Sequence, residues 1–143
     1  MSGGDERFDV IATMHRYAEA LDRRDWGLLD QVFTPAVTAD YGGEVQLAGR
    51  DELVAMIRSF LGGCGPTQHL LGNETVAVDG DTARMSCKLR AYHVGVGDRS
   101  TDFYEILGWY HTRQVRTADG WRIEHIEEET TLELGTRDVL GPA

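Results

Sequence analysis

The second half of the chain carries four long segments of strand-forming sequence joined by short turns, and this arrangement restricts the fold more than any other feature. Two of the connections, Asp79-Gly80-Asp81 and Ala118-Asp119-Gly120, contain the Asp and Gly residues typical of tight hairpin turns. Segments joined in this way pair side by side, so the sequence predicts an antiparallel meander. The four expected strands cover residues 67–78, 82–94, 101–116 and 121–134.

One of these strands shows which of its faces is buried. Along residues 82–94 the odd positions from Ala83 to Ala91 are apolar, whereas the even positions include Arg and Lys. Because successive strand residues point to opposite faces, this alternation predicts one covered face and one solvent face. His93 continues the apolar row, and we therefore expect its side chain to point towards the enclosed side.

Residues 101–116 carry large side chains on both faces. Ile106 and Tyr110 lie on one face, and Leu107 and Trp109 lie on the other. A strand with two apolar faces is usually covered on both. We expect the second cover to be another copy of the chain, which predicts a homodimer or a higher homo-oligomer.

The first half of the chain is predominantly helical. Apolar residues recur at helical spacing over residues 5–23, and Asp25 is suited to cap a second, short helix that Thr34-Pro35 ends. The further expected elements are a helix over 26–33, a hairpin of strands 36–41 and 44–47, and a helix over about 50–61. Helices that precede long strands are typical of an α+β fold with a sheet covered on one side.

We predict a single domain over residues 1–143, in the form of a cone-shaped α+β barrel. Its curved antiparallel sheet wraps around the N-terminal helices. The core covers about residues 7–134, and residues 135–143 form an untethered tail or an edge contact.

Charge and composition exclude several classes of function. Asp and Glu outnumber Lys and Arg by 24 to 14, and the formal charge of −10 repels nucleic acid. No apolar run is long enough to cross a membrane, and the first residues lack the features of a signal peptide. The two cysteines are too few for a disulfide framework, so we expect a cytoplasmic protein with reduced thiols.

The sequence contains no motif for a metal or a cofactor. It has no CxxC, HExxH, P-loop or GxSxG pattern, and its five histidines lie far from any standard metal spacing. We therefore expect neither a metal nor a cofactor. The remaining Tyr, Asp and His residues in an apolar framework suit proton transfer, elimination or hydration.

Several short segments follow one another in a characteristic order along the chain. They are Arg16-Tyr17-Ala18-Glu19-Ala20-Leu21-Asp22-Arg23-Arg24-Asp25-Trp26, Phe33-Thr34-Pro35, Thr38-Ala39-Asp40-Tyr41, Gly49-Arg50-Asp51-Glu52, Thr67-Gln68-His69-Leu70 and Asp119-Gly120-Trp121-Arg122-Ile123. Together they resemble the SnoaL-like branch of the nuclear-transport-factor-like superfamily, over about residues 7–130. That branch includes polyketide cyclases, scytalone dehydratase and bile-acid dehydratase, with ketosteroid isomerase as a more distant relative. The resemblance implies a cone that encloses a small-molecule substrate.

The resemblance also implies roles for particular residues. His69 is similar to a catalytic histidine of scytalone dehydratase, and Asp22 is similar to the carboxylate that this enzyme and bile-acid dehydratase hold at the end of the first helix. Tyr41 is similar to a scytalone dehydratase tyrosine that helps to bind a water beside the substrate carbonyl. Tyr17 is similar to the first-helix tyrosine of ketosteroid isomerase and bile-acid dehydratase, and Asp40 to the general base of the isomerase.

The chain departs from these relatives at three places. Leu21 stands where scytalone dehydratase has a tyrosine. The second catalytic histidine of that enzyme has no assigned counterpart, and His93 and His111 are the alternatives. The basic residue that bile-acid dehydratase places beyond its last Trp falls near Thr130. Substrate and reaction therefore stay open.

Simple geometry favours some of these residues over others. An aspartate that accepts from one imidazole nitrogen fixes the tautomer and makes the other nitrogen a better base, so Asp22 and His69 are expected to act as a pair. Tyr17 and Asp22 are about 140° apart on an ideal helix and share a cavity only if it wraps around the helix end. Asp40 and Tyr41 point to opposite faces of a strand, so at most one of them enters the pocket unless a bulge intervenes. The resemblance of the His69 segment to scytalone dehydratase favours Tyr41.

Together with the resemblance, the sequence predicts a cofactor-independent, dehydratase-like lyase or isomerase. It would act by acid-base catalysis on a small apolar oxygenated substrate such as a polyketide or terpenoid. The first alternative is a polyketide cyclase that uses Asp40 as its base. The second is a non-catalytic ligand-binding or assembly module. A hydrogen-bonded pair of Asp22 and His69 facing a pocket would favour catalysis, and a closed cavity without that contact would favour binding.

Overall fold

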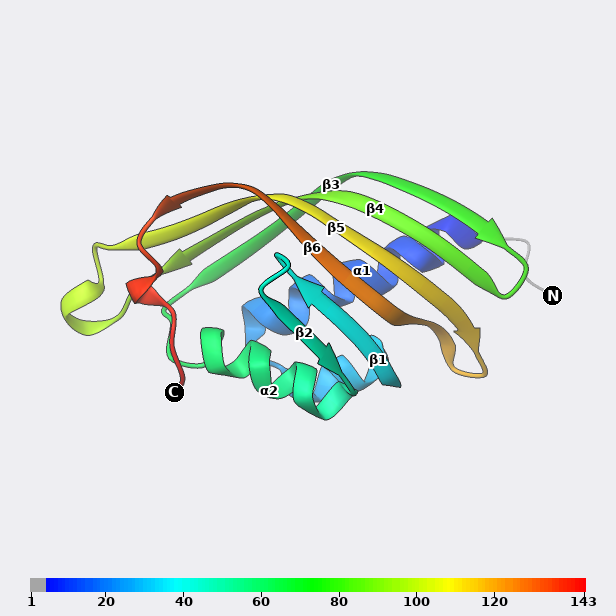
Figure 1. Ribbon diagram of the computed structural model, residues 1–143, viewed down its shortest axis with the longest axis horizontal. Coiled ribbons are helices and arrows are strands. Elements are labelled where there is room, and N and C mark those ends of the chain that lie inside the picture. The colour runs from blue at the N-terminus through cyan, green and yellow to red at the C-terminus, as the bar shows by residue number, and fades with distance from the viewer. Residues whose placement is uncertain (1–4) are drawn as a thin grey trace.

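The computed structural model describes residues 5–143 as a curved sheet that arches over a long N-terminal helix (Figure 1). The prediction that the chain starts without a signal peptide rests partly on residues 1–4, which lie outside the described residues. The helices are α1 (Glu6–Arg23) and α2 (Arg50–Leu61), and three short 3-10 helices are η1 (Trp26–Gln31), η2 (Gly97–Arg99) and η3 (Arg137–Val139). The strands are β1 (Phe33–Tyr41), β2 (Val45–Ala48), β3 (Thr67–Asp79), β4 (Thr82–Val94), β5 (Phe103–Thr117) and β6 (Gly120–Gly135).

The six strands form one sheet in the order β2-β1-β6-β5-β4-β3. The predicted antiparallel meander is confirmed, because β3, β4, β5 and β6 pair with their sequence neighbours in antiparallel fashion. Strand β1 returns beside β6 in parallel orientation, which makes the sheet mixed. The predicted α+β cone is confirmed. Its sheet does not close into a barrel, because strands β2 and β3 stay at opposite edges.

Two boundaries in the first half differ from the sequence prediction by more than one residue. The second helix is a 3-10 segment that ends at Gln31, and Asp25 caps it as expected by accepting from the Leu28 amide at 3.3 Å. Strand β1 already begins at Phe33 and passes through Pro35. Because proline has no N–H to donate, the pairing of β1 with β6 shifts its register between Phe33 and Thr38.

Helix α1 supplies much of the core. The side chain of Asp5 caps it by accepting from the Arg7 amide at 3.0 Å. Its buried face packs against the concave side of the sheet, where the odd positions of β4 point inward as the alternation predicted. The buried residues of α1 are Val10, Thr13, Met14, Tyr17, Ala18, Ala20 and Leu21.

The C-terminal residues are not an untethered tail, so of the two predicted alternatives, a tail and an edge contact, the first is wrong. After β6 the chain turns back towards the end of α2 (Figure 1). The Gly141 amide donates to the Phe60 carbonyl, and the Gly63 amide donates to the Gly141 carbonyl, both at 2.8 Å. The Cys64 thiol also donates to the Val139 carbonyl at 3.2 Å. These bonds fix the segment against the end of α2 and the loop that follows it.

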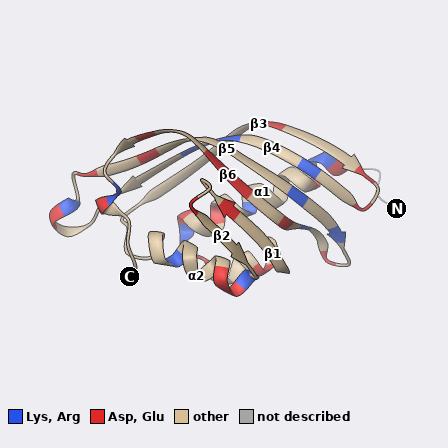
Figure 2. Cartoon of the chain, viewed as in Figure 1, with Lys and Arg blue, Asp and Glu red and all other residues tan. Residues whose placement is uncertain are grey.

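The convex face of the sheet carries apolar side chains without a cover from the described residues. Leu70, Tyr92, Leu132 and Leu134 are exposed there, and Trp109 is partly exposed. Acidic and basic residues are spread over helices and strands alike, with one acidic run in the middle of β6 (Figure 2). None of the helices in residues 5–143 is both long and apolar enough to cross a membrane.

Candidate active site

A cavity of about 140 Å³ lies between the concave face of the sheet, the end of α1, α2 and the C-terminal segment. A cavity of about 150 Å³ is known to hold a benzene ring, so this space suits a small organic molecule. Most of the wall is apolar, and the polar groups gather in two places. Its polar lining residues are Tyr17, Tyr41, Glu44, His69, His93, Tyr104, Tyr110, Glu128 and Arg137.

The first polar group is the predicted pair of Asp22 and His69. Because a carboxylate can only accept, the His69 Nδ1–H donates to Asp22 Oδ1 at 2.7 Å, and the His69 backbone amide donates to Oδ2 at 2.8 Å. The His69 side chain is only 4% exposed. This hydrogen bond fixes the tautomer and leaves Nε2 of His69 as the proton acceptor of the cavity wall.

The Asp22 carboxyl is held in its charged form. Burial acts to raise the pKa of Asp22, but the hydrogen bonds from His69 and from Thr67, whose hydroxyl donates at 3.0 Å, outweigh it and lower the pKa. Asp22 itself is not a lining residue of the cavity. Asp22 therefore acts on a ligand only through His69. For this reason Asp22 and Tyr17 do not need to face the same cavity, although they lie about 140° apart on the helix.

Arg24 fixes the end of α1 against the start of β3. This residue adopts a left-handed backbone conformation with φ 56° and ends the helix. Its guanidinium donates to the Thr67 hydroxyl at 2.8 Å and to the Gly65 carbonyl at 2.7 Å. Because Arg24 links the end of α1, which carries Asp22, to the start of β3, which carries His69, the two side chains stay within hydrogen-bonding distance.

His93 lies beside His69 on the neighbouring strand. Its side chain is buried as predicted, and the two imidazole rings meet edge to face with centroids 5.7 Å apart. The His93 Nδ1–H donates to the Tyr104 carbonyl at 2.8 Å. Burial lowers the pKa of His93 to about 4, so this ring is neutral at physiological pH.

The second polar group is a cluster of hydroxyls. The Tyr17 and Tyr41 oxygens lie 2.7 Å apart, and the Tyr17 and Tyr110 oxygens lie 3.4 Å apart. Burial raises the pKa of all three tyrosines well above the usual value, so they remain protonated. Three hydroxyl protons with only two mutual hydrogen bonds leave one O–H that can donate into the cavity.

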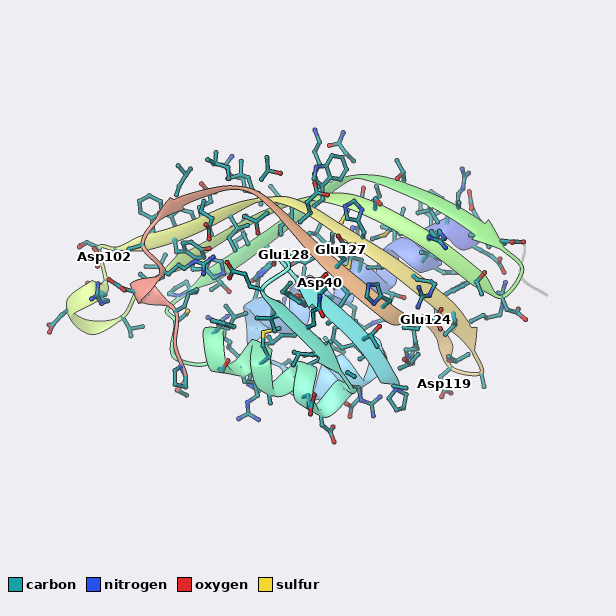
Figure 3. The ribbon with its side chains drawn as sticks, in the orientation of Figure 1. Asp40, Asp102, Asp119, Glu124, Glu127 and Glu128 are labelled. Atoms are coloured by element: carbon teal, nitrogen blue, oxygen red, sulfur yellow. The ribbon has the colours of Figure 1, made fainter. Side chains whose placement is uncertain are left out.

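The sequence prediction missed five polar residues of the wall, which are Glu44, Tyr104, Tyr110, Glu128 and Arg137. Tyr110 is on the same face of β5 as Ile106, and the alternation of that strand carried the signal. Glu128 sits in a run of three glutamates on β6, and Figure 3 labels it beside Glu127. The register pairs Glu128 with Tyr41 on one side and Tyr110 on the other.

Other candidates from the sequence lie away from the cavity. The Asp40 carboxylate accepts from the Gly43 amide at 2.9 Å in the β1–β2 turn, and it does not line the cavity. Nδ1 of His111 lies 2.7 Å from the Ser86 hydroxyl, and Nε2 lies 3.3 Å from the Glu129 carboxylate. This places His111 on the convex face. Within residues 5–143, no group of three or more His, Cys, Asp or Glu side chains is arranged to hold a metal ion.

The family is shown by a match of residues 5–127 to the SnoaL-like domain, and the chain belongs to this family. An uncharacterised protein of Mycobacterium tuberculosis, Rv2910c, is 36% identical over 119 residues, which cover 82% of this chain and 80% of that protein. The predicted resemblance to the SnoaL-like branch is therefore confirmed.

Comparison with solved structures shows the nuclear-transport-factor-like fold. A candidate scytalone dehydratase from Novosphingobium aromaticivorans aligns with a TM-score of 0.81 and 20% identity, over 96% of this chain and 91% of the other. A hexachlorocyclohexane dehydrochlorinase, LinA type 2, aligns with a TM-score of 0.80 and 14% identity, over 91% and 88% of the two chains. At these identities the likeness establishes the fold.

Proposed function

We propose that this protein is a cofactor-independent lyase or isomerase that removes a proton next to a carbonyl group of a small, mainly apolar substrate. The observation that carries the proposal is the hydrogen bond between Asp22 and His69 at the wall of the cavity. His69 Nε2 accepts the proton, and Asp22 stabilises the imidazolium that results. The neutral tyrosine cluster donates a hydrogen bond to the carbonyl oxygen, where negative charge develops.

The structural neighbours add support at the level of reaction class. One is a candidate scytalone dehydratase, and the other is named for the removal of hydrogen chloride from hexachlorocyclohexane. Both names describe eliminations, which begin with or include the loss of a proton from carbon. An oriented histidine base beside hydroxyl donors suits the same class of reaction here.

Two other functions receive less support from the site. A cyclase with Asp40 as base would need this carboxylate in the cavity, whereas Asp40 is bonded to its own turn. A binding module would have no need for an aspartate that sets the tautomer of a buried histidine. If the protein binds ketones but exchanges none of their protons, a binding module is favoured over the proposed lyase or isomerase.

The test measures proton abstraction directly. Cyclohexanone and tetralone are incubated with the protein in D2O, and exchange of the protons next to the carbonyl is followed by NMR. We expect His69→Ala to slow catalysed exchange by about 10² to 10⁴-fold, because the base is lost. Asp22→Asn should slow it by about 10- to 100-fold, the usual effect of removing the partner that orients a histidine.

His15→Ala is the matched control, because His15 lies outside the cavity and its Nε2 lies 3.1 Å from the Glu74 carboxylate. Its exchange rate should equal that of the wild-type protein. If the wild-type protein exchanges none of these ketones, or if His69→Ala exchanges them at the full rate, the proposed function is wrong.

We also propose that two copies of the chain pair through the convex face of the sheet. Leu70, Tyr92, Leu132 and Leu134 expose an apolar patch there, and such patches mark association surfaces in proteins of this size. The expected result is a dimer in sedimentation velocity, which Leu132→Glu dissociates because it places a charge in the patch. Phe8→Glu is the control, since Phe8 is 71% exposed on α1. A monomeric wild-type protein would contradict this pairing.

A further inference from the structure

Glu128 is the one carboxyl group among the described residues that lies on the cavity wall between two tyrosines. Its register partners on the flanking strands are Tyr41 of β1 and Tyr110 of β5, and all three line the same cavity as His69. The sheet thus holds Glu128 within the tyrosine cluster, in the same enclosed space as the base.

The contacts of Glu128 differ from those of an ordinary partly buried carboxylate. In residues 5–143 it takes part in no ion pair, and its hydrogen bond comes from the Thr130 hydroxyl at 2.9 Å. The Arg137 guanidinium, which also faces the cavity, donates instead to the Glu133 carboxylate at 2.6 Å. Glu128 therefore has no cation of its own to balance a negative charge.

Burial favours the protonated form of such a group. It raises the pKa of Glu128, against weaker opposing effects of the Thr130 hydrogen bond and of the charges on His69 and Arg137. The titratable groups that face Glu128 or share its cavity are Tyr17 of α1, Tyr41 of β1, Glu44 of the β1–β2 turn, His69 of β3, His93 of β4, Tyr104 and Tyr110 of β5, Glu133 of β6 and Arg137 of η3. The negative charge of Glu133 acts in the same direction as burial.

Proton abstraction by His69 serves isomerisation and elimination equally, so another group must decide between them. Loss of a hydroxyl group requires a proton donor, because hydroxide is a poor leaving group. We propose that Glu128 is the general acid that protonates the leaving hydroxyl group of a β-hydroxy ketone, which makes the reaction a dehydration. This inference rests on the proposed function of His69.

The step balances within the site. His69 Nε2 takes the proton from the carbon next to the carbonyl, and the electron pair of that C–H bond forms the C=C bond. The C–O bond to the hydroxyl group breaks, and the oxygen leaves with its electron pair and the proton of Glu128 as water. Return of the proton from His69 to Glu128 restores both groups, so the net products are an enone and water.

The experiment follows two readouts on one substrate, β-hydroxycyclohexanone. Formation of the enone is measured by ultraviolet absorbance, and proton exchange next to the carbonyl is measured by NMR in D2O. We expect Glu128→Gln to slow enone formation by about 10² to 10⁴-fold and to slow exchange far less, because the amide cannot transfer a proton. Glu127→Gln, one residue away on the exposed face of β6, should leave both rates unchanged.

Each outcome has a definite meaning. If Glu128→Gln forms the enone at the wild-type rate, or loses both activities equally, the role of Glu128 is wrong while that of His69 stands. If His69→Ala retains exchange, the proposed function itself fails. The two failures are therefore distinguishable on the same substrate.

A second measurement needs no variant, which matters if Glu128→Gln does not fold. The protonated form of Glu128 is the active one, so enone formation by the wild-type protein should fall as the pH rises through the raised pKa of Glu128. Proton exchange should not share this decrease, because it does not use the Glu128 proton. Parallel pH profiles for the two readouts would overturn the inference.

Discussion

The cavity has two polar sides, and each is associated with a carboxyl group. The pKa values of these two carboxyl groups shift in opposite directions. On one side, Asp22 receives hydrogen bonds from the His69 ring, the His69 amide and the Thr67 hydroxyl. On the other side, Glu128 receives a hydrogen bond from Thr130 and lies among tyrosine hydroxyls. The pKa of Asp22 is lowered despite its burial, whereas burial raises the pKa of Glu128.

The number of donors decides between these outcomes. Each donor to an ionised carboxylate stabilises the charged form, and burial with too few donors favours the neutral form. One side thus holds an oriented base, and the other holds a carboxyl group that burial shifts towards its protonated form. Two titratable groups whose environments push their pKa values apart are typical of acid and base roles in one site.

The largest effect that would sharpen this comparison comes from the hydroxyl side. Tyr17 occupies the centre of the cluster, with oxygens of Tyr41 and Tyr110 at 2.7 and 3.4 Å. We expect Tyr17→Phe to slow ketone proton exchange by about 10² to 10³-fold, the usual effect of losing one donor to a developing oxyanion. The effect should appear in kcat and leave KM nearly unchanged, because the donor acts on charge that develops in the transition state.

Tyr92→Phe is the matched control for this substitution. Tyr92 is 40% exposed on the convex face and stacks on Phe103 with ring centroids 5.3 Å apart. Its loss of a hydroxyl should not alter the exchange rate. An equal effect of the two substitutions would mean that the cluster has no part in stabilising the oxyanion.

Alternation and helical spacing predicted much of the fold. The apolar row of β4 placed Ala83 to His93 correctly on the concave face, and the bounds of the predicted helix 50–61 agree with α2. These predictions succeed because they depend on local periodicity, which the chain itself contains. Alternation in β1 allowed only one of Asp40 and Tyr41 to face the cavity, and the family resemblance favoured Tyr41, which lines it.

Glu128 could not be predicted in this way because β6 contains a bulge. The inward residues Trp121 and Ile123 are odd, but the pairing with β5 shifts at Glu124, and Ile126 and Glu128 then point inward. An alternation continued from Ile123 would place Glu127 inside instead. One extra residue exchanges the two faces of a strand, and the sequence shows no sign of where it occurs.

Contacts between residues far apart in the sequence also could not be predicted. Arg24 ends α1 in a left-handed conformation and binds Thr67, although nothing in the run of arginines distinguishes it from Arg23. The C-terminal segment has the composition of a free tail, yet Leu140 lines the cavity. Both depend on partners far away along the chain, which periodicity cannot identify.

A smaller effect tests the ionic side of the comparison through stability. The pKa of Asp22 is lower in the folded protein than in the unfolded chain, so its charge stabilises the fold above the unfolded value of about 3.9 and loses this effect as the pH falls through the folded value. Asp22→Asn should therefore lower the free energy of unfolding by about 1.5 to 3 kcal/mol at neutral pH, the usual worth of hydrogen bonds to a charged group.

The measurement is urea unfolding of both proteins at neutral pH and at about pH 3, where the difference between them should shrink because the wild-type carboxylate becomes protonated. Asp40→Asn is the control, since Asp40 lies near the end of β1 and Asn can still accept from the Gly43 amide. Its effect should be small at both pH values. If Asp22→Asn lowers the free energy of unfolding by the same amount at about pH 3, the charge of the Asp22 carboxylate does not stabilise this side of the cavity. The proposed contrast between the charged Asp22 and Glu128 would then be wrong.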